Sequence, residues 1–132
     1  MKFLIASLMA AAALTACSSN PAKPEAAAAA DTPTRSADGV LIGPDGKTLY
    51  TFTKDKVGSG ESACYDKCAQ NWPPLAVAPT AKPAGDYTII IRKDGARQWA
   101  YKGAPLYYFI KDMKPGDKTG DGVAGAWKLA RP

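Results

Sequence analysis

The sequence contains no histidine. This absence removes the usual general base and the commonest metal ligand, and it excludes His-ligated haem and both Ser-His and Cys-His nucleophile pairs. A phosphate-binding loop is also missing, because Gly58-Ser59-Gly60 lacks the strand-to-helix context and the lysine that such a loop needs. We therefore expect a protein that is not an enzyme and that needs no cofactor.

Clusters of basic charge are missing as well. The formal net charge is +5, but the lysines and arginines are scattered and interleaved with acidic residues. This pattern is typical of solvated surfaces and does not form the basic stripe that nucleic acids require. We expect no nucleic-acid partner.

The longest apolar run, Phe3 to Leu14, is too short to span a bilayer. It follows the positive Lys2 and ends in Leu14-Thr15-Ala16-Cys17, which resembles a bacterial lipobox. In a lipobox the signal is cleaved before the cysteine, and the cysteine is then acylated, for example with palmitate. Cys17 is thus the expected lipidation site, and the membrane is the expected first partner. Ser18 follows the cysteine, and in a Gram-negative cell this resembles the pattern sent to the outer membrane, facing the periplasm.

The chain divides into three parts. Residues 1–16 are the expected lipoprotein signal, and residues 17–37 are the acylated cysteine with a flexible Ala/Pro-rich tether. Such a tether would separate its ends by roughly 25 Å on average. Residues 38–132 are the expected folded domain, with two internal repeats at about 39–75 and 87–132.

One heptapeptide pattern, L-Y-x-F-x-K-D, occurs twice in the expected domain. The copies begin at Leu49 and Leu106, 57 positions apart. Alternation along a strand places the tyrosine and phenylalanine on one face and the leucine on the other. The aspartate near the strand end can accept backbone N–H groups of the next turn or a tyrosine hydroxyl. The motif residues are Tyr50, Phe52 and Asp55 in the first copy and Tyr107, Phe109 and Asp112 in the second.

Short strands dominate the rest of the pattern. Tyr87 to Arg92 is rich in β-branched residues, Asp94-Gly95 predicts a hairpin turn, and Arg97 to Tyr101 returns as the partner strand. Further strands are expected at Val40 to Ile42 and Ala126 to Leu129. A helix is expected from Glu61 to Asn71, with Ser62 as its N-cap. The fold class is therefore a mainly β, small antiparallel domain of two pseudo-symmetric units, with six or seven short strands and one short helix.

The cysteine pair Cys64-x3-Cys68 allows three interpretations. In an exported protein a local disulfide is the simplest. A redox-active pair is the second, and a Cu(I) site that also recruits Met113 is the third. The rival function is accordingly a periplasmic thiol-redox or copper-handling protein.

Two other patterns have competing interpretations. The segment from Asp117 to Gly122 resembles the start of a calcium loop, but the closing position falls on Lys128, so we expect a plain turn. The numerous aromatic residues suit a core, and a surplus on one sheet face would form a platform for a glycan, peptide or partner protein. The candidates for that platform are Tyr50, Trp99, Tyr107, Tyr108 and Trp127.

The two motif copies, the Cys64-x3-Cys68 pair and Trp72-Pro73-Pro74-Leu75 resemble a family of bacterial lipoproteins defined by a Y-x-[FWY]-x-x-D motif, a secreted repeat of unknown function. The likeness covers about Gly39 to Pro132 and implies an exported repeat protein without an established activity. The sequence thus predicts a lipid-anchored, non-enzymatic envelope protein that binds an unidentified ligand, such as a glycan or an envelope protein.

Overall fold

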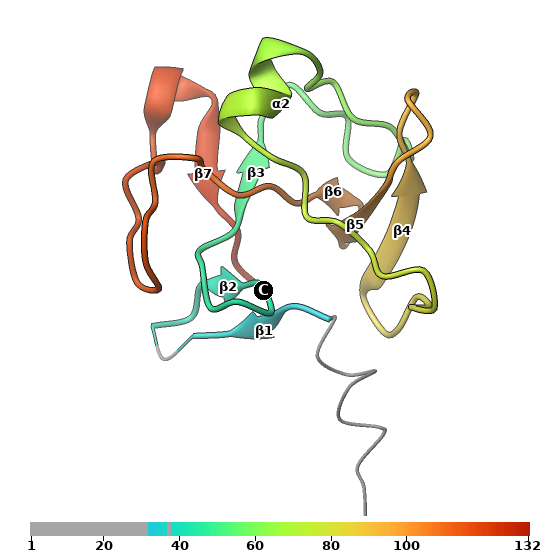
Figure 1. Ribbon diagram of the computed structural model, residues 1–132, viewed down its shortest axis with the longest axis horizontal. Helices are drawn as coiled ribbons and strands as arrows, with labels where there is room; N and C mark the ends of the chain where they lie inside the picture. The colour runs from blue at the N-terminus through green and yellow to red at the C-terminus, as the bar shows by residue number, and fades with distance from the viewer. Residues whose placement is uncertain (1–31, 37) are drawn as a thin grey trace, which may run out of the picture.

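The computed structural model describes residues 32–36 and 38–132, and its elements are mainly short strands (Figure 1). Among these residues no helix is long and apolar enough to cross a membrane. The expected signal, Cys17 and most of the expected tether lie outside the described residues. The strands are β1 (Thr34–Arg35), β2 (Leu41–Ile42), β3 (Tyr50–Phe52), β4 (Tyr87–Ile91), β5 (Arg97–Tyr101), β6 (Ala104–Pro105) and β7 (Trp127–Leu129), and the helices are α2 (Lys67–Asn71) and the 3-10 turn η1 (Val123–Gly125).

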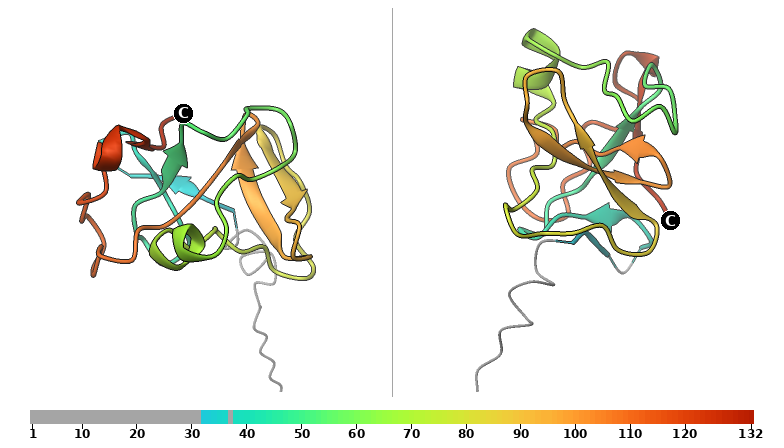
Figure 2. Two further views of the ribbon diagram at one scale, coloured as in Figure 1. Left: turned by 90° about the horizontal axis from the view of Figure 1, so that it is seen from above. Right: turned by 90° about the vertical axis from the view of Figure 1, so that its right-hand side faces the viewer.

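The strands form three small antiparallel sheets, ordered β1-β2, β3-β7 and β4-β5-β6. Strand β3 lies in the first half of the chain and β7 at its end, so the central sheet joins the two repeats. The β4–β5 hairpin lies on one side of the molecule and β7 with η1 on the other, with β3 between them (Figure 2). The predicted mainly β class with two repeats and one short helix is confirmed.

The two repeats are related by matching backbone hydrogen bonds. Tyr50 and Tyr107 exchange a pair of N–H to carbonyl bonds of 2.8 and 3.0 Å at the centre of the molecule. On either side of this pair, three hydrogen bonds of one half have counterparts in the other half. The matched bonds are Leu49 N to Leu41 O with Leu106 N to Trp99 O, Ala130 N to Leu49 O with Leu75 N to Leu106 O, and Leu41 N to Ala130 O with Trp99 N to Leu75 O.

Each motif segment bonds to the last segment of the opposite repeat. Leu49 receives its bond from Ala130 of the second repeat, and Leu106 receives its bond from Leu75 of the first. Each repeat therefore completes the backbone hydrogen bonding of the other, and the two repeats do not form independent units.

The predicted alternation within each motif divides the core into two clusters. Tyr50, Tyr107 and Phe109 belong to one cluster, with Phe52 packed against it. Leu49 and Leu106 point the other way, into the second cluster. The period of two in the sequence thus places each motif strand between two apolar layers.

Four aromatic rings form a continuous stack in the first cluster. Phe52 stacks on Trp127 at 4.2 Å, Trp127 on Trp72 at 3.8 Å, and Trp72 on Phe109 at 4.1 Å between ring centroids. Each motif phenylalanine therefore contacts a tryptophan of the other repeat. Gly120 covers this stack, because a Cβ atom there would lie 2.7 Å from the Trp72 ring and 2.9 Å from Phe109.

The β4–β5 hairpin follows the sequence closely. Its register runs from Tyr87 opposite Tyr101 to Ile91 opposite Arg97. Gly95 has a φ of +89° in the connecting turn, a conformation that glycine adopts without steric cost. The Asp94-Gly95 turn signal therefore marked the hairpin correctly.

Three local expectations need correction. The helix was expected from Glu61, but α2 begins at Lys67, because Asp66 has a positive φ of 55° and the Ser62 hydroxyl accepts the Cys64 N–H in a turn. The second motif forms only a bridge at Tyr107, which pairs with Tyr50 on one side and Pro74 on the other. Paired structure also begins at β1, within the segment assigned to the tether, because Thr34 and Arg35 pair with β2.

Replacing Trp72 by alanine would remove the ring that contacts Trp127, Phe109 and Tyr50. Trp72 is 5% exposed, so the cavity would be closed on nearly all sides. We expect a loss of about 3 to 5 kcal/mol in the free energy of unfolding, measured by urea denaturation. The control Val57→Ala, at a residue 65% exposed, should change it by less than about 0.5 kcal/mol. Equal effects of the two substitutions would contradict the central role of the stack.

Candidate functional site

The tyrosines and aspartates of the two motifs form reciprocal hydrogen bonds. The Tyr50 hydroxyl donates to Asp112 Oδ2 at 2.6 Å, and the Tyr107 hydroxyl donates to Asp55 Oδ2 at 2.6 Å. All four side chains are buried, with at most 7% of each exposed. The motif therefore joins the two repeats, since neither tyrosine contacts the aspartate of its own copy.

The second oxygen of each carboxylate holds the loop that follows it. Asp55 Oδ1 accepts the backbone N–H of Ala63 at 2.6 Å. Asp112 Oδ1 accepts the N–H of Thr119 at 2.9 Å and its hydroxyl at 2.6 Å. Both possibilities foreseen for the aspartates, a turn N–H and a tyrosine hydroxyl, occur together.

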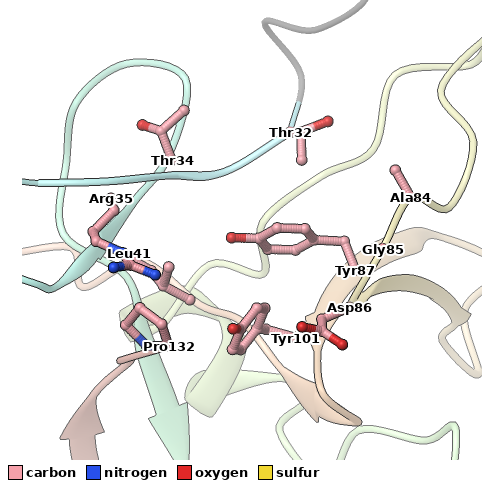
Figure 3. A pocket seen from close by; sticks show the side chains of 10 residues that line it. All are labelled: Thr32, Thr34, Arg35, Leu41, Ala84, Gly85, Asp86, Tyr87, Tyr101 and Pro132. Atoms are coloured by element: carbon pink, nitrogen blue, oxygen red, sulfur yellow. The ribbon is translucent and has the colours of Figure 1, made fainter.

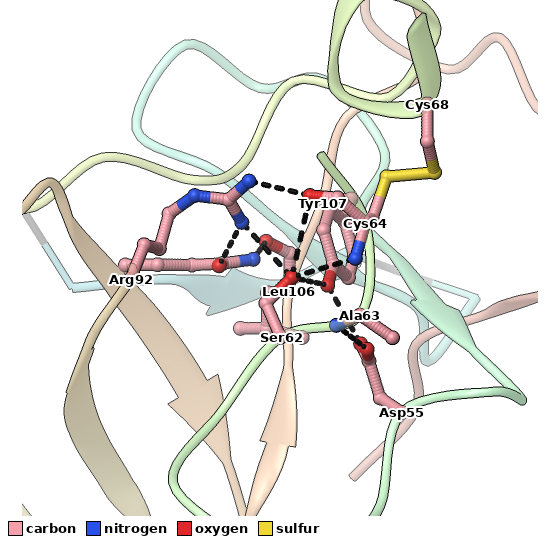
Figure 4. Close-up of a disulfide and its surroundings, with 9 residues drawn as sticks. Asp55, Ser62, Ala63, Cys64, Cys68, Arg92, Leu106 and Tyr107 are labelled. Atoms are coloured by element: carbon pink, nitrogen blue, oxygen red, sulfur yellow. Dashed lines mark hydrogen bonds between the residues drawn. A yellow bond between two sulfur atoms is a disulfide. The ribbon is translucent and has the colours of Figure 1, made fainter. Parts of the chain in front are cut away.

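On the Asp55 side, the network continues to a buried arginine of the second repeat (Figure 4). The Tyr107 hydroxyl lies 2.7 Å from Ser62 Oγ, and Arg92 donates to Ser62 Oγ at 3.0 Å and to Gln98 Oε1 at 2.7 Å. Arg92 also donates to the backbone carbonyl of Cys64. The Arg92 side chain is almost fully buried, which the sequence did not indicate because a charged residue at the end of a predicted strand carries no local sign of its buried partners.

Burial shifts the pKa values of three groups in these networks. It raises the pKa of the Asp55 carboxyl above its usual 3.8, against the lowering by the Tyr107 and Ala63 hydrogen bonds and by the Arg92 charge. Burial and the neighbouring aspartates also raise the pKa of the Tyr50 and Tyr107 hydroxyls. Because its folded pKa is raised, Asp55 contributes most to stability below its unfolded pKa, and this contribution falls as pH rises through the folded pKa.

Cys64 and Cys68 form a disulfide in the structure. Cys64 is completely buried and immediately precedes the helical turn, whereas Cys68 lies in α2 and is partly exposed. Met113 is 76% exposed, after the end of the second motif. A Cu(I) site at Cys64, Cys68 and Met113 would therefore first require reduction of the disulfide.

The other metal pattern folds as a turn. Asp117 Oδ2 accepts the N–H groups of Met113 and Lys114, and Asp121 Oδ1 accepts that of Leu129. Over residues 32–36 and 38–132, histidine, cysteine and acidic side chains form no group of three suited to a metal ion.

Four of the five aromatic residues considered for a platform belong to the core. Tyr50, Trp99, Tyr107 and Trp127 are at most 4% exposed, so the platform interpretation is wrong for them. Tyr108 is half-buried, and its hydroxyl donates to Asp45 at 3.1 Å. The residues fill the core because both faces of the motif strands are covered.

A different aromatic pair lines an open pocket of about 470 Å³ (Figure 3). Tyr87 of β4 and Tyr101 of β5 lie opposite each other in the register, with ring centroids 4.9 Å apart. Their rings point from the hairpin toward Arg35 of β1 and Leu41 of β2. Sequence reasoning missed this site because Arg35 lies in the segment assigned to the tether, more than 50 positions before Tyr87.

The family model for a secreted repeat of unknown function matches residues 32–76 and 88–131. The chain belongs to this family. The two matched segments of the secreted repeat coincide with the two halves that the hydrogen bonds relate to each other. No curated protein and no solved structure matches the chain.

Replacing Tyr107 by phenylalanine in this secreted repeat would leave buried Asp55 Oδ2 without its tyrosine donor. We expect a loss of about 2 to 3 kcal/mol in the free energy of unfolding, because a buried carboxyl oxygen is left without a donor. Tyr50→Phe should act in the same direction through Asp112. The control Tyr65→Phe removes a hydroxyl that only accepts the Lys93 N–H at the surface, and it should cost less than about 1 kcal/mol. If Tyr107→Phe costs no more than the control in urea denaturation, the reciprocal bonds do not hold the repeats together.

Proposed function

We propose that this protein is a lipid-anchored envelope protein that works by binding a ligand and not by catalysis. Membership of a secreted family supports export, and the lipobox ending at Cys17 supports an acyl anchor. In a Gram-negative cell the anchor would lie in the outer membrane, with the domain facing the periplasm. Candidate partners are the membrane, envelope glycans and envelope proteins.

The observation that carries the binding proposal is the pocket between the β1–β2 hairpin and the β4–β5 hairpin. Its volume lies within the range of small-molecule sites, and its lining combines aromatic rings with a few polar groups, as such sites do. The motif residues, in contrast, are engaged with one another in the core. They hold the fold together, and contact with a ligand must come from other residues at the surface.

The position of the pocket fits an anchored protein. Thr32, the first described residue, lines it together with Thr34 and Arg35. The chain therefore connects to its expected tether beside the pocket. A tether of the expected kind would hold a ligand bound there within roughly 25 Å of the membrane surface.

Full-length protein purified in mild detergent should sediment with isolated envelope material, either peptidoglycan sacculi or outer-membrane vesicles. Cys17→Ser, which cannot be acylated, should lose incorporation of labelled palmitate and still sediment with the material that the pocket recognises. Tyr101→Ala should reduce this sedimentation at least about fivefold, because it removes half of the aromatic lining.

The matched control is Ile91→Ala, a side chain that is 60% exposed on the same hairpin. It should leave sedimentation unchanged. Lack of sedimentation by the parent protein with every envelope fraction, or equal effects of both substitutions, would contradict the binding proposal.

The rival redox or copper-handling function is tested through the disulfide. Its loop spans only four positions, so removing it should lower the free energy of unfolding by about 2 kcal/mol in the chain-entropy account. Cys64→Ala with Cys68→Ala should therefore lower the midpoint of urea denaturation and leave envelope sedimentation intact at low temperature. A variant that stays equally stable but loses sedimentation, or parent protein that binds Cu(I) tightly after mild reduction, would favour the rival.

A further inference from the structure

We propose that Tyr87, Tyr101 and Arg35 form a binding site for an acidic sugar, with its ring against the tyrosines and its carboxylate on the guanidinium. This inference rests on the proposed binding function and names the chemical class of the ligand. The three side chains come from β4, β5 and β1, so the tertiary structure alone brings them together (Figure 3).

The tyrosine pair is held rigidly from below. Tyr87 packs edge-on against Trp99 at 6.3 Å and 81°, and Trp99 is completely buried. The two tyrosine rings are tilted by 51° to each other, so together they form an angled wall and not a closed stack. Both side chains remain partly exposed. Preorganised, half-exposed rings offer apolar contact area at little entropic cost.

A sugar ring matches such a wall because one face carries C–H groups and its rim carries hydroxyls. The C–H face packs on the aromatic surface, and the rim needs polar partners around it. The pocket lining includes the polar side chains of Thr32 and Asp86 for this purpose. A wholly apolar ligand would leave these groups without partners.

One basic side chain of the pocket favours an acid. Burial raises the pKa of the Tyr87 hydroxyl, the Arg35 charge opposes this rise and Asp86 adds to it, which is consistent with both charged groups lying near that ring. The Lys102 ammonium lies 5.4 Å from the Tyr101 ring centroid. Lys102 does not line the pocket, so Arg35 is the one basic residue of the lining and Asp86 the one acidic residue. In the part of the chain that the structure describes, no ion pair involves Arg35. A guanidinium with an accessible face binds a carboxylate through two parallel hydrogen bonds.

The pocket is open and about 470 Å³ in volume, which suits one sugar unit with room for its neighbours to leave the site. An acidic unit within a longer glycan could therefore bind as well as the free sugar. A proline-rich peptide could also stack on two tyrosines, but it would not need the carboxylate-binding guanidinium.

The test compares two matched sugars on the full-length protein in mild detergent. N-acetylmuramic acid carries a carboxylate that N-acetylglucosamine lacks, and NMR titration or calorimetry measures both. We expect the acidic sugar to bind at least about fivefold more tightly, and Arg35→Gln to remove this preference. Tyr87→Leu should weaken both sugars, because each needs the ring.

Lys54→Gln is the control for charge, since Lys54 is an exposed cation outside the pocket lining. It should leave both affinities unchanged. D-glucuronate against D-glucose repeats the comparison with an unrelated acid. Equal affinity for acidic and neutral sugars, an unchanged preference in Arg35→Gln, or stronger binding of a proline-rich peptide than of either sugar would overturn the proposal.

A competition experiment separates this inference from the proposed function. Free acidic sugar should displace the protein from envelope material, whereas the neutral sugar should not. If sedimentation depends on Tyr101 but no acidic sugar competes, the inference fails and the binding function stands. If the protein does not sediment with envelope material at all, both fail.

Discussion

The hydrogen bonds from Tyr50 to Asp112 and from Tyr107 to Asp55 are the constraint on which the domain depends. A buried carboxylate is costly unless donors surround it. Each aspartate obtains one donor from the opposite repeat and another from the loop that follows its own motif. Neither repeat can satisfy its own motif alone, so the pair must fold together. The central backbone bonds between Tyr50 and Tyr107 set the two motif strands in the register that this exchange requires.

The aromatic stack joins the two repeats in the same reciprocal way, through apolar ring contacts. Phe52 and Phe109 each stack on the tryptophan of the other repeat, and the two tryptophans meet at the centre. The symmetry is nevertheless incomplete. Arg92 of the second repeat extends the polar network from Ser62 toward the β4–β5 hairpin, and the Cys64–Cys68 disulfide belongs to the first repeat. The symmetric pairing of the two repeats thus carries one asymmetric network, which anchors the β4–β5 hairpin. Tyr87 and Tyr101 lie at the end of this hairpin opposite its turn.

The repeat framework and the proposed ligand contacts are therefore separated in this protein. The residues that define the repeat are buried and bonded to one another, while the pocket is built by strand ends at the border between the hairpins. Trp99 connects the two regions, since it packs in the second core cluster and supports Tyr87 from below. Binding residues placed on rigid hairpins keep their geometry without help from the ligand.

Local signals in the sequence determined the local parts of this protein. The alternation in Leu49-Tyr50-Thr51-Phe52 assigned each side chain to its face, and the β-branched run with Asp94-Gly95 defined the β4–β5 hairpin. Only the tertiary structure decided which tyrosine meets which aspartate, that Arg92 is buried, and that Arg35 joins Tyr87 and Tyr101. It also decided that the helix is shorter than predicted, because the Ser62 hydroxyl forms hydrogen bonds with Tyr107 and Arg92 and does not cap a helix. The physical reason is that periodicity and turn chemistry act over a few residues, whereas these contacts join positions tens of residues apart and depend on how the two repeats pack.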